Sequence, residues 1–350
     1  MAIQVLTTEE FISLASAYPV LDVRSPSEYS HAHIPGAYNL PLFDDMERAV
    51  VGTAYKQESR EAAIKIGLGY FGPKMKCMVE QAEKLTGSYT IPSEKSILIH
   101  CWRGGMRSGA VAWLFDLYGF KVYTLKGGYK AYRNWVLDQF GKIYNFKILG
   151  GNTGSGKTYL LYELVKQGKN VINLEGLASH KGSAFGNIGM PAQPSQEMFE
   201  NMLALELHNK SNRNQPIWME DESQRIGTVN VPGPLWQTML ISPVYFLDIP
   251  FEERLDFIVK EYGSLEKERL VNAIIRIKKR LGGLETKNAV SHLIEDNIRE
   301  SFRILLNYYD KSYAKSLNKK ENIMELLITI PCEKVAPIEN ALSILNFSNY

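Results

Sequence analysis

Cysteine is scarce in this sequence, and positive and negative charges nearly cancel. The chain has 350 residues and 3 Cys, namely Cys77, Cys101 and Cys332, which form no C-x-x-C pair. So sparse and odd a set argues against a disulfide framework and against a structural zinc site. Lys and Arg number 40 and Asp and Glu 38, a formal net charge of +2. This balance does not by itself indicate a nucleic-acid-binding protein, although a local basic patch could still serve one.

Long hydrophobic runs are also missing. No stretch approaches the ~18 apolar residues of a membrane span, and the opening residues, MAIQVLTTEEFISLASAYPV, have no basic segment followed by an apolar one. We therefore expect a soluble, cytoplasmic protein with no membrane partner. Hydrophobic residues make up 45% and charged residues 22%, which is typical of folded globular chains and excludes a disordered or collagenous one.

The length suggests two domains, and the sequence pattern divides near residues 140–146. In each part, short apolar strands alternate with helical segments, which predicts a parallel sheet covered on both faces. We predict domains at 1–140 and 146–350, the second with a helical C-terminal region from 251 to about 317. The predicted strands are 19–23, 37–40, 96–100 and 121–125 in the first domain and 146–149, 171–174, 217–219 and 244–247 in the second; residues 46–88 are predicted to be mostly helical.

A phosphate-binding loop opens the second domain. The sequence GNTGSGKT satisfies the G-x-x-x-x-G-K-[ST] motif and lies between a predicted strand and a predicted helix. Its backbone N–H groups and the helix N-terminus form a cradle for a diphosphate or triphosphate, Lys157 adds a positive charge, and Thr158 can bind Mg²⁺. The predicted diphosphate-binding residues are Gly151, Asn152, Thr153, Gly154, Ser155, Gly156, Lys157 and Thr158.

Two further segments of the second domain are candidates for the same site. The strand 217–219 runs into Glu220 and Asp221, and one of these acids would hold Mg²⁺ or its water shell, unless the acids are a solvated strand end. The segment 174–186 follows another strand at the edge where open α/β sheets bind substrates. Its predicted substrate-binding residues are Glu175, Ser179, His180, Lys181 and Ser183.

Cys101 has the surroundings of a reactive thiol. It follows a buried strand in the sequence HCWRGGMRS, which leads into a helix. Inward N–H groups and the positive helix end lower a thiol pKa and favour the nucleophilic thiolate. Arg103 and Arg107 can strengthen this field and clasp an oxyanion. Cys77 and Cys332 lack such surroundings, and we predict that both are packing residues.

The first domain resembles the rhodanese family in LDVRSPSEY (21–29), HIPGAYNLP (33–41), the Cys101 loop and LKGGY (125–129). Rhodaneses use the loop cysteine to carry sulfur or selenium. Here Cys101 and Arg107 enclose five residues, one more than in common sulfurtransferases, and this spacing is also that of cysteine phosphatases. Phosphatase chemistry therefore stays open, although bulky Trp102 and the attached second domain argue against a protein-phosphate substrate.

The order of CWRGGMRS, GNTGSGKT, LEGLASHKGSAFG and WMEDESQRIG, together with the insertion 47–57, is similar to that of the tRNA 2-selenouridine synthases over nearly the whole chain. The resemblance implies conversion of wobble 2-thiouridine in tRNA to 2-selenouridine with selenophosphate, through an S-geranylated intermediate made from geranyl diphosphate. It implies catalytic roles for Cys101, Arg103, Arg107 and Lys157, with the P-loop as a prenyl-transfer site and Mg²⁺ as its cofactor. It leaves room for a selenium-donor enzyme as a further partner.

Two other functions stay open. Residues 244–250 followed by Glu252 and Arg254 look like the late strand and helix of small-molecule kinases, which would make the chain a P-loop kinase fused to a sulfurtransferase or cysteine-phosphatase-like domain. Alternatively, the first domain senses thiols and the second binds nucleotide in a regulatory module without enzymatic activity.

One segment of the helical region is a candidate tRNA-binding surface. Basic residues at helical spacing lie opposite an apolar stripe, and such a row can follow phosphates; a solvated helix face explains the pattern equally well. The aromatic residues Tyr308, Tyr309 and Tyr313 could stack on bases, but their spacing is more typical of a core. The basic residues are Arg269, Arg276, Lys279 and Arg280.

Overall fold

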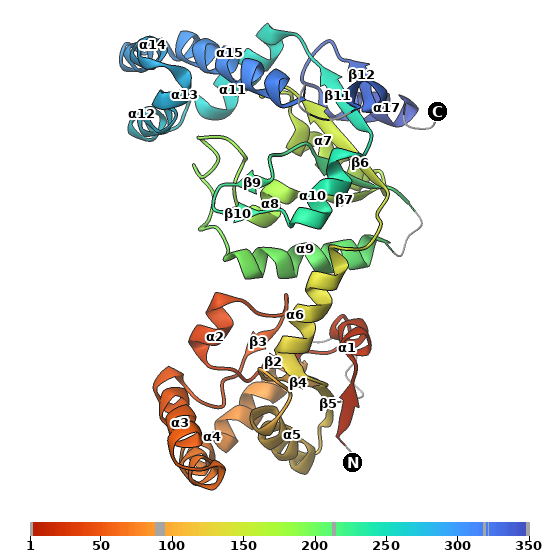
Figure 1. Ribbon diagram of the computed structural model, residues 1–350, viewed down its shortest axis with the longest axis vertical. Coiled ribbons are helices and arrows are strands. Elements are labelled where there is room, and N and C mark those ends of the chain that lie inside the picture. Colours follow the sequence, from red (N-terminus) through yellow and green to blue (C-terminus); the bar gives the residue numbers. More distant parts are fainter. Residues whose placement is uncertain (1–2, 88–94, 212–214, 318–319, 321, 348–350) are drawn as a thin grey trace. The chain divides into compact units, whose positions relative to one another are not determined.

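The chain divides into two compact units, each with its own five-stranded sheet (Figure 1). The computed structural model describes residues 3–87, 95–211, 215–317, 320 and 322–347. The first unit comprises Met1–Gln139 and Glu200–Leu205, and the second comprises Phe140–Phe199 and Glu206–Tyr350. No helix in these described residues is long and apolar enough to cross a membrane.

The first unit has a fully parallel sheet in the order β1-β5-β4-β2-β3. The alternation of strands and helices predicted from the sequence is confirmed. The strands are β1 (Gln4–Leu6), β2 (Val20–Asp22), β3 (Tyr38–Asn39), β4 (Ser96–His100) and β5 (Lys121–Leu125). The helices are α1 (Thr8–Ala15), α2 (Pro26–His31), α3 (Asp45–Gln57), α4 (Arg60–Gly87), α5 (Met106–Tyr118) and α6 (Gly128–Gln139).

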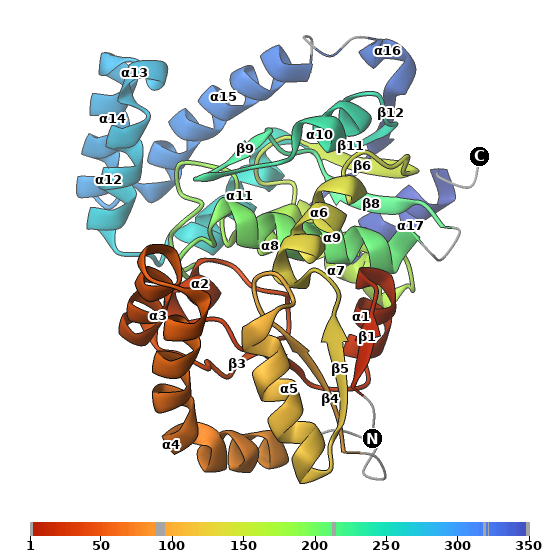
Figure 2. The same ribbon diagram turned by 60° about the horizontal axis from the view of Figure 1, so that its bottom comes forward.

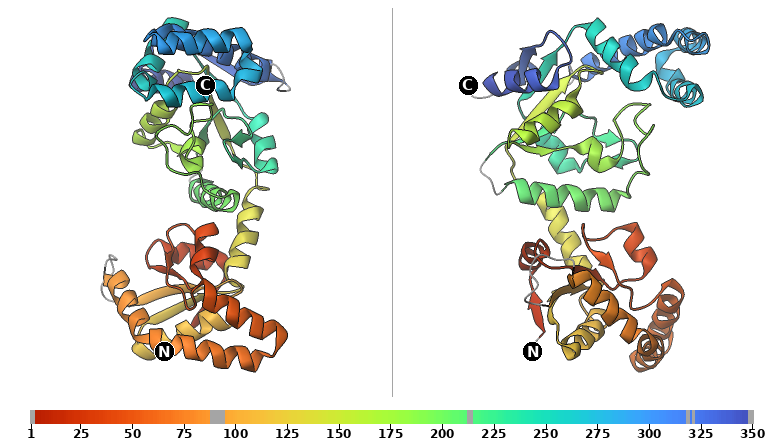
Figure 3. Two further views of the ribbon diagram at one scale, coloured as in Figure 1. Left: turned by 90° about the vertical axis from the view of Figure 1, so that its left-hand side faces the viewer. Right: turned by 180° about the vertical axis from the view of Figure 1, so that it is seen from behind.

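Local details of this unit differ from the prediction. The edge strand β1 was not predicted, because its three residues are largely exposed and show no buried apolar run. The predicted helix 46–88 is two helices, since Ser59 begins α4 by accepting a hydrogen bond from the Ala62 amide; residue 88 lies outside the described residues. Helices α3 and α4 lie side by side (Figure 3).

The core of the first unit surrounds β4. Ile97, Leu98 and Ile99 are completely buried because α4 and α5 pack together, as do α1 and α6. A parallel sheet covered on both faces requires such continuous apolar strands. The polar residues that follow β4 therefore emerge from the most buried strand of the unit.

The second unit has a parallel sheet in the order β12-β11-β6-β8-β7. Its strands are β6 (Phe146–Gly151), β7 (Asn170–Ile172), β8 (Ile217–Glu220), β11 (Val244–Asp248) and β12 (Leu327–Pro331). Its helices include α7 (Lys157–Lys166), α8 (Leu174–Ala178), α10 (Gly233–Leu240) and α17 (Pro337–Phe347), and the residues of α9 (Gln196–Ser211) are divided between the two units. A small antiparallel pair, β9 (Arg225–Ile226) and β10 (Val229–Asn230), was not predicted. The predicted strand 171–174 ends earlier, because Asn173 caps α8.

The predicted helical region is confirmed, and Figure 2 shows α12, α13 and α14 grouped beside α15. The helices are α11 (Phe251–Tyr262), α12 (Lys267–Arg276), α13 (Lys278–Leu281), α14 (Gly283–Ile294), α15 (Ile298–Leu317) and α16 (Ile323–Leu326). The basic segment 269–280 is not one helix: it breaks at Ile277, between α12 and α13. After α16 the chain returns to the sheet, where β12 pairs with β11.

Two glycine turns position the loop after β4. A Cβ atom on Gly104, at φ +64°, would lie 2.6 Å from the Leu125 carbonyl oxygen, and one on Gly128, at φ +61°, would lie 2.4 Å from the Cys101 carbonyl oxygen. The Tyr129 amide also donates a hydrogen bond of 2.8 Å to that carbonyl. The loops after β4 and β5 thus pack backbone against backbone.

We expect Gly128→Ala to lower the free energy of unfolding by more than about 3 kcal/mol and to slow alkylation of Cys101. The matched control is Gly119→Ala, which has the same kind of strain at φ +103° but no atom within 4 Å of the new Cβ and should cost roughly 1–2 kcal/mol. Urea unfolding and mass spectrometry of the Cys101 peptide measure both effects. Equal losses in the two variants would contradict the backbone packing described for these loops.

Candidate functional site

The Cys101 thiol lies between the end of β4 and the start of α5. Its side chain is buried, and its Sγ atom is 3.2 Å from the Ser108 hydroxyl. Burial alone would raise the pKa of Cys101, but hydrogen bonds from the Ser108 side chain and amide and from the Gly105 amide, with the charge of Arg107, bring the pKa below its usual value. The site therefore favours a thiolate.

The two arginines of this loop lie in different surroundings. Arg107 donates from Nη1 to Glu28 at 2.6 Å and from Nη2 at 3.3 Å, and Glu28 also accepts the Ser25 amide at the start of α2. Arg103 is exposed. The oxyanion clasp that we predicted is thus not preassembled: Arg107 is held by a carboxylate, which an incoming anion would have to replace.

A buried network of charged and polar side chains lies next to the start of the Cys101 loop. Arg24 donates from Nε to Asp22 at 2.9 Å and from Nη2 to the Ala32 carbonyl at 2.7 Å. Both charged side chains are buried, and His100 Nε2 lies 3.7 Å from Asp22. Burial lowers the pKa of His100, which favours the neutral ring. We assigned these residues no role from the sequence, although polar residues inside a buried strand were the available signal.

The other two cysteines behave differently from each other. Cys332 is buried, and burial raises its pKa to about 11, so its prediction as a packing residue is confirmed. Cys77 is exposed on α4, where it accepts a hydrogen bond from Gln81 at 3.1 Å. The prediction that Cys77 packs in a core was wrong, because its position on α4 faces away from the residues that α4 buries.

The P-loop of the second unit links the end of β6 to the start of α7. Gly151, Gly154 and Gly156 have φ angles of +147°, +83° and +71°, which residues other than glycine rarely adopt. Lys157 reaches back over the loop and donates a hydrogen bond of 2.8 Å to the Gly151 carbonyl oxygen. Ser155 is buried, with no partner for its hydroxyl among the described residues. The loop thus has the shape and the donors of a diphosphate cradle.

Carboxylates gather beside the start of α7. Thr158 donates to Glu175 Oε2 at 3.0 Å, and the Glu175 amide donates to Glu220 Oε1 at 2.7 Å. Burial, reinforced by the charge of Glu175, raises the pKa of Glu220 to about 8. Burial and Glu175 likewise raise the pKa of Glu222 well above its usual value. The other oxygen of Glu220 is buried without a partner among the described residues. Burial thus favours the protonated form of this carboxyl, which the nearby charge of Lys157 opposes.

Asp221 is bound by the C-terminal part of the unit. It accepts hydrogen bonds from the Tyr313 hydroxyl at 2.7 Å and from Lys320 Nζ at 2.6 Å. The Tyr313 hydroxyl in turn accepts the Gly151 amide at 3.3 Å. Of the predicted metal ligands, Thr158 contacts Glu175, Glu220 accepts the Glu175 amide, and Asp221 has Lys320 as a cationic partner.

A resident Mg²⁺ fits this site only with few protein ligands. Across the described part of the chain, no three His, Cys, Asp or Glu side chains are arranged to hold a metal ion. Mg²⁺ commonly binds through one or two protein oxygens and completes its shell with water and substrate phosphates. The Thr158 hydroxyl, the Glu175 carboxylate and the unpartnered oxygen of Glu220 are compatible with that kind of binding.

The predicted substrate loop continues from α8. Ser179 ends α8 in the left-handed conformation at φ +50°, and burial lowers the pKa of His180. Lys181 Nζ lies 5.3 Å above the Tyr262 ring. The Ser183 hydroxyl accepts the Phe185 amide at 3.2 Å and lines a cavity next to the P-loop.

The basic candidates lie on two helices near this loop. Arg269 pairs with Glu266, whereas Arg276 donates at 3.4 Å to Asn187, next to the substrate loop. Lys279 and Arg280 are exposed on α13. Arg276 thus lies beside the substrate loop, and Lys279 and Arg280 follow the break at Ile277 on α13.

Comparisons with known proteins cover most of the chain. A family model described as the tRNA 2-selenouridine synthase AAA domain matches residues 144–329, and a rhodanese-like domain model matches residues 7–134. The tRNA 2-selenouridine synthase of Sulfurovum sp. (strain NBC37-1) is 36% identical over 86% of this chain and 89% of its own length. That of Pseudomonas putida (strain W619) is 35% identical over 88% and 91%. The chain belongs to the tRNA 2-selenouridine synthase family.

Membership of this family confirms the predicted succession of a rhodanese-like domain and a P-loop domain. The Cys101 site lies in the part matched by the rhodanese-like model, and the P-loop with its carboxylates lies in the part matched by the synthase AAA model. The crystal structure of the N-terminal domain of a Clostridium difficile 630 protein is 42% identical over 38% of this chain and 99% of that chain, with a TM-score of 0.36.

We expect Ser108→Ala to raise the pKa of Cys101, because the variant loses a hydrogen bond that stabilises the thiolate. The rise of the alkylation rate with pH should therefore move to higher pH. Ser96→Ala is the matched control, since Ser96 is equally buried in the same unit and its hydroxyl has no partner among the described residues. Mass spectrometry of the Cys101 peptide after iodoacetamide treatment excludes the signal of exposed Cys77. The same profile in all three proteins would refute the assigned role of Ser108.

Proposed function

We propose that this chain is a transferase that converts 2-thiouridine in tRNA to 2-selenouridine in two steps. The second unit first transfers a geranyl group from geranyl diphosphate to the sulfur atom. The first unit then supports replacement of that sulfur by selenium from selenophosphate. The single observation that carries this proposal is that one chain, similar along most of its length to tRNA 2-selenouridine synthases, contains both a diphosphate cradle and a loop that favours a thiolate.

In the first step, the sulfur atom of the base attacks C1 of the geranyl group. A C–S bond forms, the C–O bond to diphosphate breaks, diphosphate leaves with the electron pair, and the N3 proton of the base passes to solvent. The P-loop amides and Lys157 stabilise the charge that develops on the leaving group. Lys157 can turn to that group because its present partner is a neutral carbonyl. Thr158 and Glu175 would hold Mg²⁺, which supplies further positive charge.

In the second step, the selenium atom of selenophosphate attacks C2 of the base. The C2–S bond breaks, and geranyl thiol leaves with a proton from solvent. The Cys101 thiolate then attacks phosphorus, so that the P–Se bond breaks and selenium stays on C2, and water hydrolyses the resulting S–P bond to release phosphate. Alkylation makes this step feasible because a thiocarbonyl sulfur is a poor leaving group. The loop amides at the start of α5 and Arg107, once it leaves Glu28, would bind the selenophosphate oxyanion, with Arg103 at the exposed side.

The structure gives the kinase-like segment a different use. Glu252 pairs with Arg299 and Arg303 on α15. Arg254 is buried, pairs with Asp310 and donates a hydrogen bond of 3.0 Å to the Thr153 carbonyl. These contacts attach the P-loop and α11 to α15 and give a packing reason for the residues that resemble a kinase helix. The assay below distinguishes the kinase alternative.

Nucleoside mass analysis tests the division of labour between the two units. Incubated with 2-thiouridine-containing tRNA, Mg²⁺ and geranyl diphosphate, the wild type and Cys101→Ala should form the geranylated nucleoside. Lys157→Ala should lose at least about 100-fold in this rate, as when a single transition-state donor is removed. After selenophosphate is added, only the wild type should form appreciable 2-selenouridine. ATP consumption with another acceptor and neither tRNA product would overturn the proposal.

Charge reversal tests the RNA-binding surface. Arg276→Glu with Arg280→Glu should weaken tRNA binding by roughly tenfold or more at moderate salt. The salt dependence should also fall, because each lost phosphate contact lowers the slope of log affinity against log salt concentration by about 1. Arg60→Glu with Lys65→Glu on α4 changes the net charge equally at exposed positions and is the control. Filter-binding or anisotropy titrations give both quantities, and equal affinities of the two double variants would remove α12 and α13 from the tRNA footprint.

A further inference from the structure

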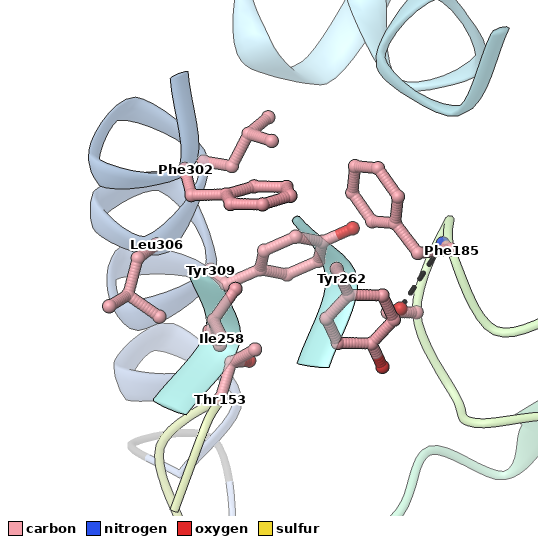
Figure 4. Close-up of a pocket in the computed structure, with 9 residues that line it drawn as sticks. Thr153, Phe185, Ile258, Tyr262, Phe302, Leu306 and Tyr309 are labelled. Atoms are coloured by element: carbon pink, nitrogen blue, oxygen red, sulfur yellow. Dashed lines mark hydrogen bonds between the residues drawn. The ribbon is translucent and has the colours of Figure 1, made fainter. Parts of the chain in front are cut away.

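An aromatic cavity adjoins the P-loop within the second unit (Figure 4). Thr153 belongs both to the P-loop and to the cavity wall. Gly154 packs so closely on α11 that an added Cβ would lie 2.8 Å from Ile258, another wall residue. A ligand whose diphosphate occupies the P-loop can therefore extend directly into this cavity. The lining residues are Thr153, Ser183, Phe185, Ile258, Tyr262, Phe302, Leu305, Leu306 and Tyr309.

The chemistry of the wall selects an uncharged, apolar group. Phe185, Tyr262 and Phe302 face one another edge-on or tilted, with ring centroids 6.2–6.5 Å apart. The Tyr309 hydroxyl already accepts the Ala184 amide at 3.2 Å, and no charged side chain lines the cavity. Apolar pockets with few polar groups bind hydrocarbon parts of ligands. Aromatic faces also stabilise positive charge, such as that on an allylic carbon as its diphosphate departs.

Charged residues of both signs lie around the cavity, with Glu175 and Glu261 near Tyr262 and several basic residues. Lys181 lies above Tyr262, and burial raises the pKa of Tyr309 to about 12 although nearby Arg280 acts to lower it. Arg276 is close enough to His180 to act, with burial, against protonation of that ring. The basic residues Lys181, Arg276 and Arg280 suit contacts with the phosphates of an RNA that brings one base to an apolar reactant.

We propose that this cavity binds the hydrocarbon chain of the allylic diphosphate and that Phe302 and Leu306, both on α15, limit the length of chain accepted. The proposal rests on the proposed function and adds chain-length selection to it. The reacting C1 then lies at the P-loop end, beside Thr153, and the far end of the chain lies against α15. Binding of the hydrocarbon chain in the cavity is non-covalent, and the bonds that form and break are those of the geranyl transfer described above.

Leu306→Ala tests the proposal by enlarging the cavity. The full-length protein is assayed with 2-thiouridine-containing tRNA and either geranyl or farnesyl diphosphate, and kcat/KM is measured for each donor. The ratio of farnesyl to geranyl should rise at least about tenfold, in line with the discrimination of one or a few methylene groups by apolar pockets. Leu293→Ala is the matched control, because Leu293 is a fully buried leucine of the same hydrophobic cluster but does not line the cavity. Its ratio should equal that of the wild type.

Phe302→Leu is a milder second variant in case Leu306→Ala does not fold, and it should raise the same ratio. If the wild type transfers no prenyl group from either donor, the proposed function fails. If the wild type transfers geranyl but neither cavity variant changes the ratio, the cavity proposal fails while the proposed function stands. An unchanged ratio together with weaker ATP binding in the cavity variants would assign the cavity to a nucleobase and also overturn the proposal.

Discussion

Both candidate sites depend on one constraint: a loop must leave the carboxyl end of a buried parallel strand and turn its backbone N–H groups toward an anion. In the first unit Gly104 and Gly128 permit this turn by packing backbone against backbone. In the second, Gly151, Gly154 and Gly156 permit it by adopting positive φ. In each case a helix begins immediately afterwards, so its N-terminus adds positive potential to the same point.

The charges around the two loops are arranged differently. Around Cys101, hydrogen bonds and Arg107 outweigh burial and stabilise negative charge on sulfur. Beside the P-loop, burial and the charge of Glu175 disfavour ionisation of Glu220 and of neighbouring Glu222. The first site therefore favours a thiolate, whereas the second favours protonated carboxyls at Glu220 and Glu222. This difference agrees with an anion-binding reactive cysteine in one unit and a diphosphate-dependent transfer in the other.

Sequence patterns predicted most of the architecture and the two loops, but not which acid contacts Thr158 of the P-loop. Both predicted metal acids end a strand next to the P-loop strand, yet Asp221 is bound by Tyr313 and Lys320. Glu175 contacts Thr158 instead because α8 starts directly after β7 and turns that residue inward. Cys77 was misjudged for a related reason: its exposure depends on which face of α4 packs, and a helix with no clear apolar stripe does not reveal that face.

The sequence by itself determined the two candidate anion-binding loops, because consecutive residues encode them: glycines at the turns, the Lys or Cys within, and the helix that follows. Only the tertiary structure decided the partner of Asp221, the ion pair of Arg107 with Glu28, and the aromatic cavity beside Thr153. These features join residues far apart in the chain, such as Phe185 on a loop and Phe302 on α15. Their meeting depends on how helices pack on a sheet, which no local pattern of apolar and polar residues specifies.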